Sequence, residues 1–66
     1  MRFQRITVNP GVARGKACIR GLRFPVSRLL GLLAAGETRE SILTSYPYLE
    51  AADIDEALLY GYYLAE

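Results

Sequence analysis

The sequence has no histidine, no tryptophan and a single cysteine, Cys18, among its 66 residues. One cysteine cannot form an internal disulfide, and without histidine the chain has no plausible zinc site. A cysteine nucleophile would also need a nearby base, a role that histidine usually fills. We therefore expect no catalytic residue, no metal ligand and no cofactor, and we take the chain not to be an enzyme. Cys18 is expected to be buried as a small apolar side chain.

Long apolar runs are absent as well. No segment approaches the roughly 18 apolar residues of a membrane-spanning helix, and the first five residues lack the apolar core of a secretory signal. These absences predict a cytoplasmic protein with no membrane contact. A composition that is 52% hydrophobic and 23% charged is typical of a chain that folds rather than one that stays disordered.

The length predicts a single domain over residues 1–66 with a small core. A domain of this size buries only about 60% of its unfolded surface, and its core supplies about 3–5 kcal/mol. Since neither a disulfide nor a metal is expected to add stability, we predict that a second chain does. The chain is expected to form a homo-oligomer, as a dimer, or to bind a partner protein.

Acidic residues are missing from the first 36 positions. That stretch has seven cations and a net charge of +7. The remaining residues have seven acids against one cation, Arg39, for a net charge of −6, so the whole chain sums to +1. Such asymmetry between halves is typical of proteins that bind nucleic acid or a charged partner. Alternatively, the two halves merely neutralise one another.

Hydrophobic periodicity divides the chain into an extended part and a helical part. Residues 4–9 alternate polar and apolar side chains, which predicts a short strand with Ile6 and Val8 on one face. Asn9-Pro10-Gly11 is a turn signal that ends this strand. Residues 16–24 form a second extended stretch, interrupted by a glycine. Residues 1–25 are thus predicted to be a basic arm or hairpin.

From Pro25 onward the apolar spacing becomes helical. One helix is expected to begin at Pro25 or Ser27 and to end at Gly36 as its C-cap. A second, short helix opens at Thr38 and stops before Pro47. The last begins near residue 50. The fold class is therefore mainly α: short N-terminal strands or a hairpin, then a three-helix bundle of the helix-turn-helix type over residues 26–66.

Four stretches, taken in order, resemble a known family. They are Gly15–Val26 (GKACIRGLRFPV), Leu29–Leu30, Ala35–Leu43 (AGETRESIL) and Tyr46–Leu49 (YPYL). The family is domain of unknown function 433, and the resemblance runs from Ile6 to about Tyr60. It implies a homeodomain-like helix-turn-helix fold. It also implies a VapB-type, antitoxin-like role in a prokaryotic toxin–antitoxin system, in which the protein binds a PIN-like toxin and represses its own operon.

The last predicted helix has the wrong charge for a DNA-recognition helix. Such a helix normally brings basic or amide side chains to the bases, whereas residues 50–66 contain five acids and no cation. Any DNA contact therefore falls to the basic hairpin, because a two-stranded ribbon can enter a groove. The candidate DNA-binding residues are Arg5, Arg14, Lys16, Arg20 and Arg23. Arg23 has an alternative role, in which it pairs with an acid of the last helix.

Tyrosines cluster near the C-terminus. Tyr60, Tyr62 and Tyr63 lie within four residues, so they cannot all face one core on a helix with 3.6 residues per turn. With Leu59 and Leu64 they are the candidate dimer or partner interface, since aromatic side chains are favoured in interface cores. The alternative function is a self-assembling structural or interaction module without a DNA role. In that case the acidic helix of one subunit meets the basic arm of another.

Overall fold

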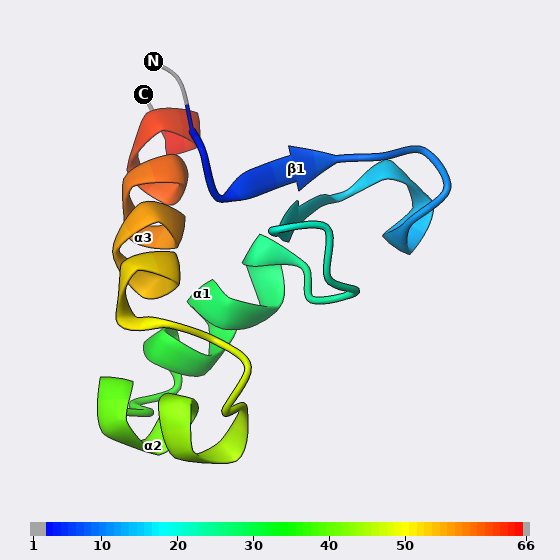
Figure 1. Ribbon diagram of the computed structural model, residues 1–66. Coiled ribbons are helices and arrows are strands. Elements are labelled where there is room, and N and C mark those ends of the chain that lie inside the picture. The colour runs from blue at the N-terminus through cyan, green and yellow to red at the C-terminus, as the bar shows by residue number, and fades with distance from the viewer. Residues whose placement is uncertain (1–2, 66) are drawn as a thin grey trace.

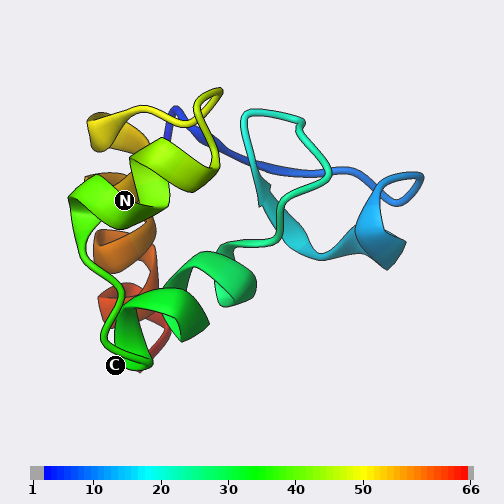
Figure 2. The same cartoon turned by 90° about the horizontal axis from the view of Figure 1, so that it is seen from below.

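A two-stranded hairpin stands to one side of three helices (Figures 1 and 2). The structure is a computed structural model that describes residues 3–65. Its elements are β1 (Ile6–Val8), the short turn η1 (Ala13–Gly15), β2 (Ala17–Ile19), α1 (Val26–Ala34), α2 (Arg39–Ser45) and α3 (Ala51–Ala65). The predicted fold class is confirmed: a short N-terminal hairpin precedes a small helical bundle. The helix-turn-helix role within that bundle stays a prediction.

The hairpin is antiparallel and buried at one end. Ile6 lies opposite Ile19, and Val8 lies opposite Ala17. Ile19 is fully buried and Ile6 half-buried, whereas Val8 is 64% exposed. The apolar face of β1 therefore reaches the core only through Ile6. The predicted turn after β1 is present, because the Asn9 side-chain Oδ1 accepts a hydrogen bond from the N–H of Gly11 at 2.9 Å.

The far end of the hairpin turns through left-handed backbone. Ala13, Arg14 and Gly15 all have positive φ angles, of 49°, 59° and 80°. Only glycine adopts this region without strain, and other residues lose roughly 1–2 kcal/mol there. Arg14 is consequently fixed at the tip of the hairpin at an energetic cost, with its side chain exposed.

One apolar core joins all the helices to β2. Its buried members are Ile19, Phe24, Val26, Leu29, Ile42, Leu49, Ile54 and Ala57. Cys18 is 2% exposed, as predicted for a small apolar side chain. At Gly61 the helices α3 and α1 approach closely, since a Cβ atom there would lie 3.0 Å from Leu30 Cδ1. None of the helices in residues 3–65 combines the length and apolar character needed to cross a bilayer.

The predicted helix ends are confirmed at two caps. The Thr38 hydroxyl accepts a hydrogen bond from the N–H of Ser41 at 3.0 Å and so begins α2. Gly36 follows α1 with a φ of 95°. Beyond it, the N–H of Glu37 donates to the carbonyl of Leu32 at 3.0 Å, which closes the last turn.

Two glycines near the end of α1 are expected to respond oppositely to alanine. Gly36→Ala places a Cβ in left-handed backbone and should lower the free energy of unfolding by about 1 kcal/mol. Gly31→Ala, inside α1 with open space around its Cβ position, should raise it by up to about 1 kcal/mol. Urea unfolding of both variants measures the two changes, and equal signs would contradict the C-cap role of Gly36.

Candidate functional site

The first turn of α3 holds a buried carboxylate, that of Asp53, which is 0% exposed. Its Oδ1 accepts from Arg20 Nε and from Arg5 Nη1, each at 3.0 Å. Its Oδ2 accepts from Arg20 Nη2 at 3.0 Å and from the backbone N–H of Glu50 at 2.8 Å. The last of these bonds is half of a capping box, in which a side chain in the first turn satisfies the N–H at the N-cap. Asp53 therefore closes the start of α3 and anchors two arginines.

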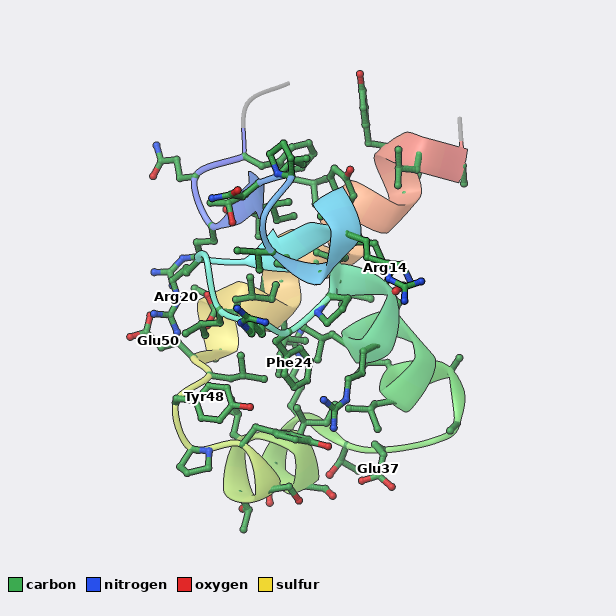
Figure 3. The ribbon with its side chains drawn as sticks, turned by 90° about the vertical axis from the view of Figure 1, so that its right-hand side faces the viewer. Arg14, Arg20, Phe24, Glu37, Tyr48 and Glu50 are labelled. Carbon is green, nitrogen blue, oxygen red and sulfur yellow. The ribbon has the colours of Figure 1, made fainter. Side chains whose placement is uncertain are left out.

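The two arginines make further bonds that tie the hairpin to α3. Arg20 Nη2 donates to the carbonyl oxygen of Tyr48 at 2.7 Å, and Arg5 Nη1 donates to Glu50 Oε1 at 2.6 Å. The backbone N–H of Arg5 donates to Glu56 Oε1, also at 2.6 Å. Arg20 and Glu50 lie together at one edge of the molecule in Figure 3. We refer to Arg5, Arg20, Glu50 and Asp53 as the Asp53 cluster.

The Asp53 carboxylate is ionised at neutral pH. Burial by itself raises the pKa of Asp53, but the hydrogen bonds from Arg20, the Glu50 N–H and Arg5 outweigh it and hold the pKa below 3.8. The pKa of Arg5 is raised by its hydrogen bonds to Glu50 and then to Asp53, and the pKa of Arg20 is raised by its hydrogen bonds to Asp53. The buried carboxylate thus keeps its charge because every lone-pair direction meets a donor.

Asp53 is expected to make the protein sensitive to acid. Its folded pKa lies below the unfolded value, so its contribution to stability is complete only well above pH 3.8, where the folded and unfolded chains are both ionised at this group. As the pH falls below 3.8, the unfolded chain takes up the proton first, and the contribution is lost through the folded pKa. Urea unfolding at a series of pH values should show this loss. The free energy of unfolding of Asp53→Asn should change less with pH below 3.8 than that of the wild type. An equal change in both proteins would contradict the role of Asp53 in acid sensitivity.

The structure separates the five candidate DNA-binding residues into two groups. Arg5 and Arg20 belong to the Asp53 cluster, so their charges are already neutralised within one chain. Arg14, Lys16 and Arg23 are exposed and form no ion pair with an acid of residues 3–65. The pairing with the last helix that was considered for Arg23 is made instead by Arg5 and Arg20. The aspartate three residues after the N-cap position of α3 is a sequence signal for the capping bond, but it does not indicate which arginines pair with it.

Three aromatic side chains pack together beside the start of α1, and Arg28 lies against them. Arg28 was not among the residues that the sequence indicated as functional. The rings of Phe24, Tyr46 and Tyr48 meet edge to face, with centroids 5.0–6.4 Å apart. The Arg28 guanidinium lies 4.9 Å from the centre of the Phe24 ring and 5.2 Å from that of Tyr46. Arg28 Nη2 also donates a hydrogen bond to the Tyr46 hydroxyl at 3.1 Å.

The last turns of α3 expose an apolar stripe. Leu58, Leu59, Tyr62 and Tyr63 have relative positions i, i+1, i+4 and i+5, which share one helix face, and they are 42–63% exposed. We call these four residues the α3 apolar surface. Tyr60 instead turns inward and is half-buried, with its ring 5.1 Å from that of Phe3. Two of the three tyrosines are therefore outside the core, in line with the helical spacing.

A groove of about 430 Å³ lies behind the α3 apolar surface, between α1, α3 and the start of β2. It takes in Tyr60 and Leu64, the two members of the predicted interface that are not part of that surface. Its lining is Lys16, Ala17, Val26, Ser27, Leu30, Tyr60 and Leu64. Within residues 3–65, no group of three or more acidic, cysteine or histidine side chains is placed to hold a metal ion.

Comparison with known proteins connects this architecture to a family. The family described as "Protein of unknown function (DUF433)" matches residues 6–61, which include the hairpin, three of the four residues of the Asp53 cluster and most of α3. The chain belongs to this family. The resemblance noted in the sequence is thereby confirmed at the level of the family.

A solved family member has the same fold. The crystal structure of a DUF433 member protein from Anabaena variabilis, at 2.00 Å resolution, superposes with a TM-score of 0.80 and 38% sequence identity. The match covers 85% of this chain and 55% of that one, so this chain spans about half the length of its solved relative. No curated protein matches the sequence.

Proposed function

We propose that this DUF433 protein is an antitoxin-like binding module of a toxin–antitoxin pair. In this role it binds a PIN-like toxin as its partner, binds operator DNA as an autorepressor, and has no catalytic activity. The toxin–antitoxin role is the one that the family resemblance implies. The observation that carries the proposal on the structural side is the α3 apolar surface, because it is an exposed apolar stripe on a small domain.

Several features of this surface favour a protein partner. It contains two tyrosines, and tyrosine is among the residues enriched at the energetic centres of interfaces. Tyr62 is 63% exposed, so much of its ring has no contact within the chain. Binding of a second protein over Tyr62, Tyr63 and the neighbouring leucines would add apolar burial that a domain of this size lacks.

Co-expression with a PIN-like nuclease encoded next to this gene tests the proposal. The wild-type chain should copurify with the nuclease and relieve its toxicity. Tyr62→Asp should lower the amount captured at least tenfold, because it places a charge in the interface. Val8→Asp is the matched control, since Val8 is 64% exposed but lies on the hairpin. Equal capture by both variants would show that the α3 apolar surface is not the binding site.

The self-assembling module is the second candidate function. The same apolar surface favours it, as a face for a second copy of the chain. One version of this function has the acidic helix of one subunit pair with the basic arm of another. This version loses support, because Arg5 and Arg20 form ion pairs with Glu50 and Asp53 within one chain. Light scattering distinguishes the candidates. A dimer that Tyr62→Asp and Tyr63→Asp convert to a monomer, together with no capture of the nuclease, would favour self-assembly alone.

A further inference from the structure

The structure divides the cations of residues 3–65 into those with an acid partner and those without one. Arg5 and Arg20 pair with Asp53, and Arg39 pairs with Asp55 at 2.6 Å. Four exposed cations have no acid partner within residues 3–65, and they are Arg14, Lys16, Arg23 and Arg28. We propose that these four form the surface that holds the phosphate backbone of duplex DNA. The inference rests on the DNA-binding part of the proposed function and names its residues.

Three of the four cations lie along one continuous piece of backbone. The N–H of Ile19 donates to the carbonyl of Phe24 at 3.0 Å, and Cys18 bridges to Pro25. These contacts hold β2 against the loop that leads into α1. Lys16 immediately precedes β2, Arg23 lies in the loop and Arg28 lies in the first turn of α1. The core therefore fixes their relative positions, as a phosphate-binding surface requires.

The fourth cation, Arg14, lies apart from the acids of the Asp53 cluster. In Figure 3, Arg14 lies to one side of Phe24, and Arg20 and Glu50 lie to the other. Glu37 lies lower in this view, on the same side as Arg14, and its Oε1 accepts a hydrogen bond from the Ser41 hydroxyl at 2.6 Å. The strongest concentration of acids is thus held by Arg5 and Arg20, away from Arg14. A polyanion that approaches at the Arg14 edge meets positive charge first.

The side chain of Arg28 has a defined orientation within this surface. Its guanidinium is held by the rings of Phe24 and Tyr46 and by the Tyr46 hydroxyl. These contacts are made without any carboxylate, so they orient the group but leave its charge unneutralised. A pre-oriented guanidinium loses less conformational entropy when it binds, and its planar fork suits two phosphate oxygens.

The composition of the surface points to backbone contacts rather than base contacts. Arginine and lysine at the surface position a protein on the duplex, whereas sequence is read by side chains that enter a groove. Four phosphate contacts predict that the logarithm of affinity falls with the logarithm of salt concentration with a slope of about −3.6. That slope weakens binding about a hundredfold when the salt concentration rises fourfold.

Fluorescence anisotropy with a labelled duplex from upstream of the chain's own gene tests the assignment. Arg23→Gln and Arg28→Gln should each weaken binding severalfold and make the salt slope shallower by about 0.9. Arg39→Gln removes the same charge from a cation that is already paired with Asp55, so it should leave both affinity and slope close to wild type. Thermal unfolding by circular dichroism confirms that the three variants are folded.

The possible failures are distinguishable. If the wild-type chain does not bind the duplex at any salt concentration, the inference and the DNA-binding part of the proposed function both fall, while toxin capture is judged separately. If the wild type binds and Arg23→Gln and Arg28→Gln bind equally well, only the inference falls. If these two variants lose nuclease capture and keep DNA binding, the surface belongs to a protein partner, which also overturns the inference.

Discussion

Asp53→Asn is expected to lower the free energy of unfolding by about 3 kcal/mol, at the low end of what is lost when one partner of a buried ion pair is removed. The asparagine keeps the size of the side chain but not its charge. Arg5 and Arg20 would then face each other across a neutral amide, and at least one of the present hydrogen bonds would be lost. We expect a loss of free energy at the low end of this range because both arginine side chains are 33% exposed, so water partly solvates them.

A loss of this size matters for so small a domain. A core that supplies about 3–5 kcal/mol leaves little margin, so a substantial fraction of the Asp53→Asn chain should be unfolded at room temperature. Urea titration followed by circular dichroism measures the change. Asp55→Asn is the matched control, because the Asp55 side chain is 64% exposed and its pair with Arg39 is at the surface. Similar midpoints for the two variants would contradict a stabilising role for the Asp53 cluster.

Phe24→Ala is expected to have an effect at least as large, about 3–5 kcal/mol. Phe24 is 1% exposed and is among the largest fully buried side chains of the core. Its removal leaves a cavity between β2 and α1, where the surrounding backbone is fixed by the Ile19–Phe24 hydrogen bond. It also removes one ring of the aromatic group and one of the two rings that hold Arg28.

The experiment for Phe24 needs a variant that stays folded. Phe24→Leu keeps most of the buried volume and should cost much less than Phe24→Ala, while it still removes the ring beneath Arg28. Urea midpoints of the two variants give the volume effect. In the DNA-binding assay, Phe24→Leu should weaken binding less than Arg28→Gln does, because Tyr46 still contacts the guanidinium. A Phe24→Ala midpoint near the wild-type value would contradict the burial argument.

Local patterns predicted most of the secondary structure because the relevant forces are local. The hydroxyl of Thr38 and the conformational freedom of Gly36 act within one helical turn, and both caps are present. The turn at Asn9 depends on a side chain that bonds two residues ahead.

The candidate site was harder to predict because its contacts join distant parts of the chain. Arg5 and Asp53 are 48 residues apart, and Arg20 and Asp53 are 33 apart. The sequence offered Arg23 for the pairing with α3, since nothing in the local pattern distinguishes one exposed arginine from another. Arg28 was overlooked for the same reason, because its role depends on Tyr46 from another helix.

Local patterns along the chain were enough to predict the order and type of the main elements, the basic first half, the acidic second half and the family. Capping, periodicity and charge are properties of neighbouring residues, so they can be read without coordinates. Which charges cancel depends instead on how the distant parts of the chain fold together. Folding brings the acids of α3 against Arg5 and Arg20 and leaves Arg14, Lys16, Arg23 and Arg28 without an acid partner in residues 3–65. The physical reason is that folding buries the Asp53 carboxylate completely and places the guanidinium groups of Arg5 and Arg20 within hydrogen-bonding distance of it.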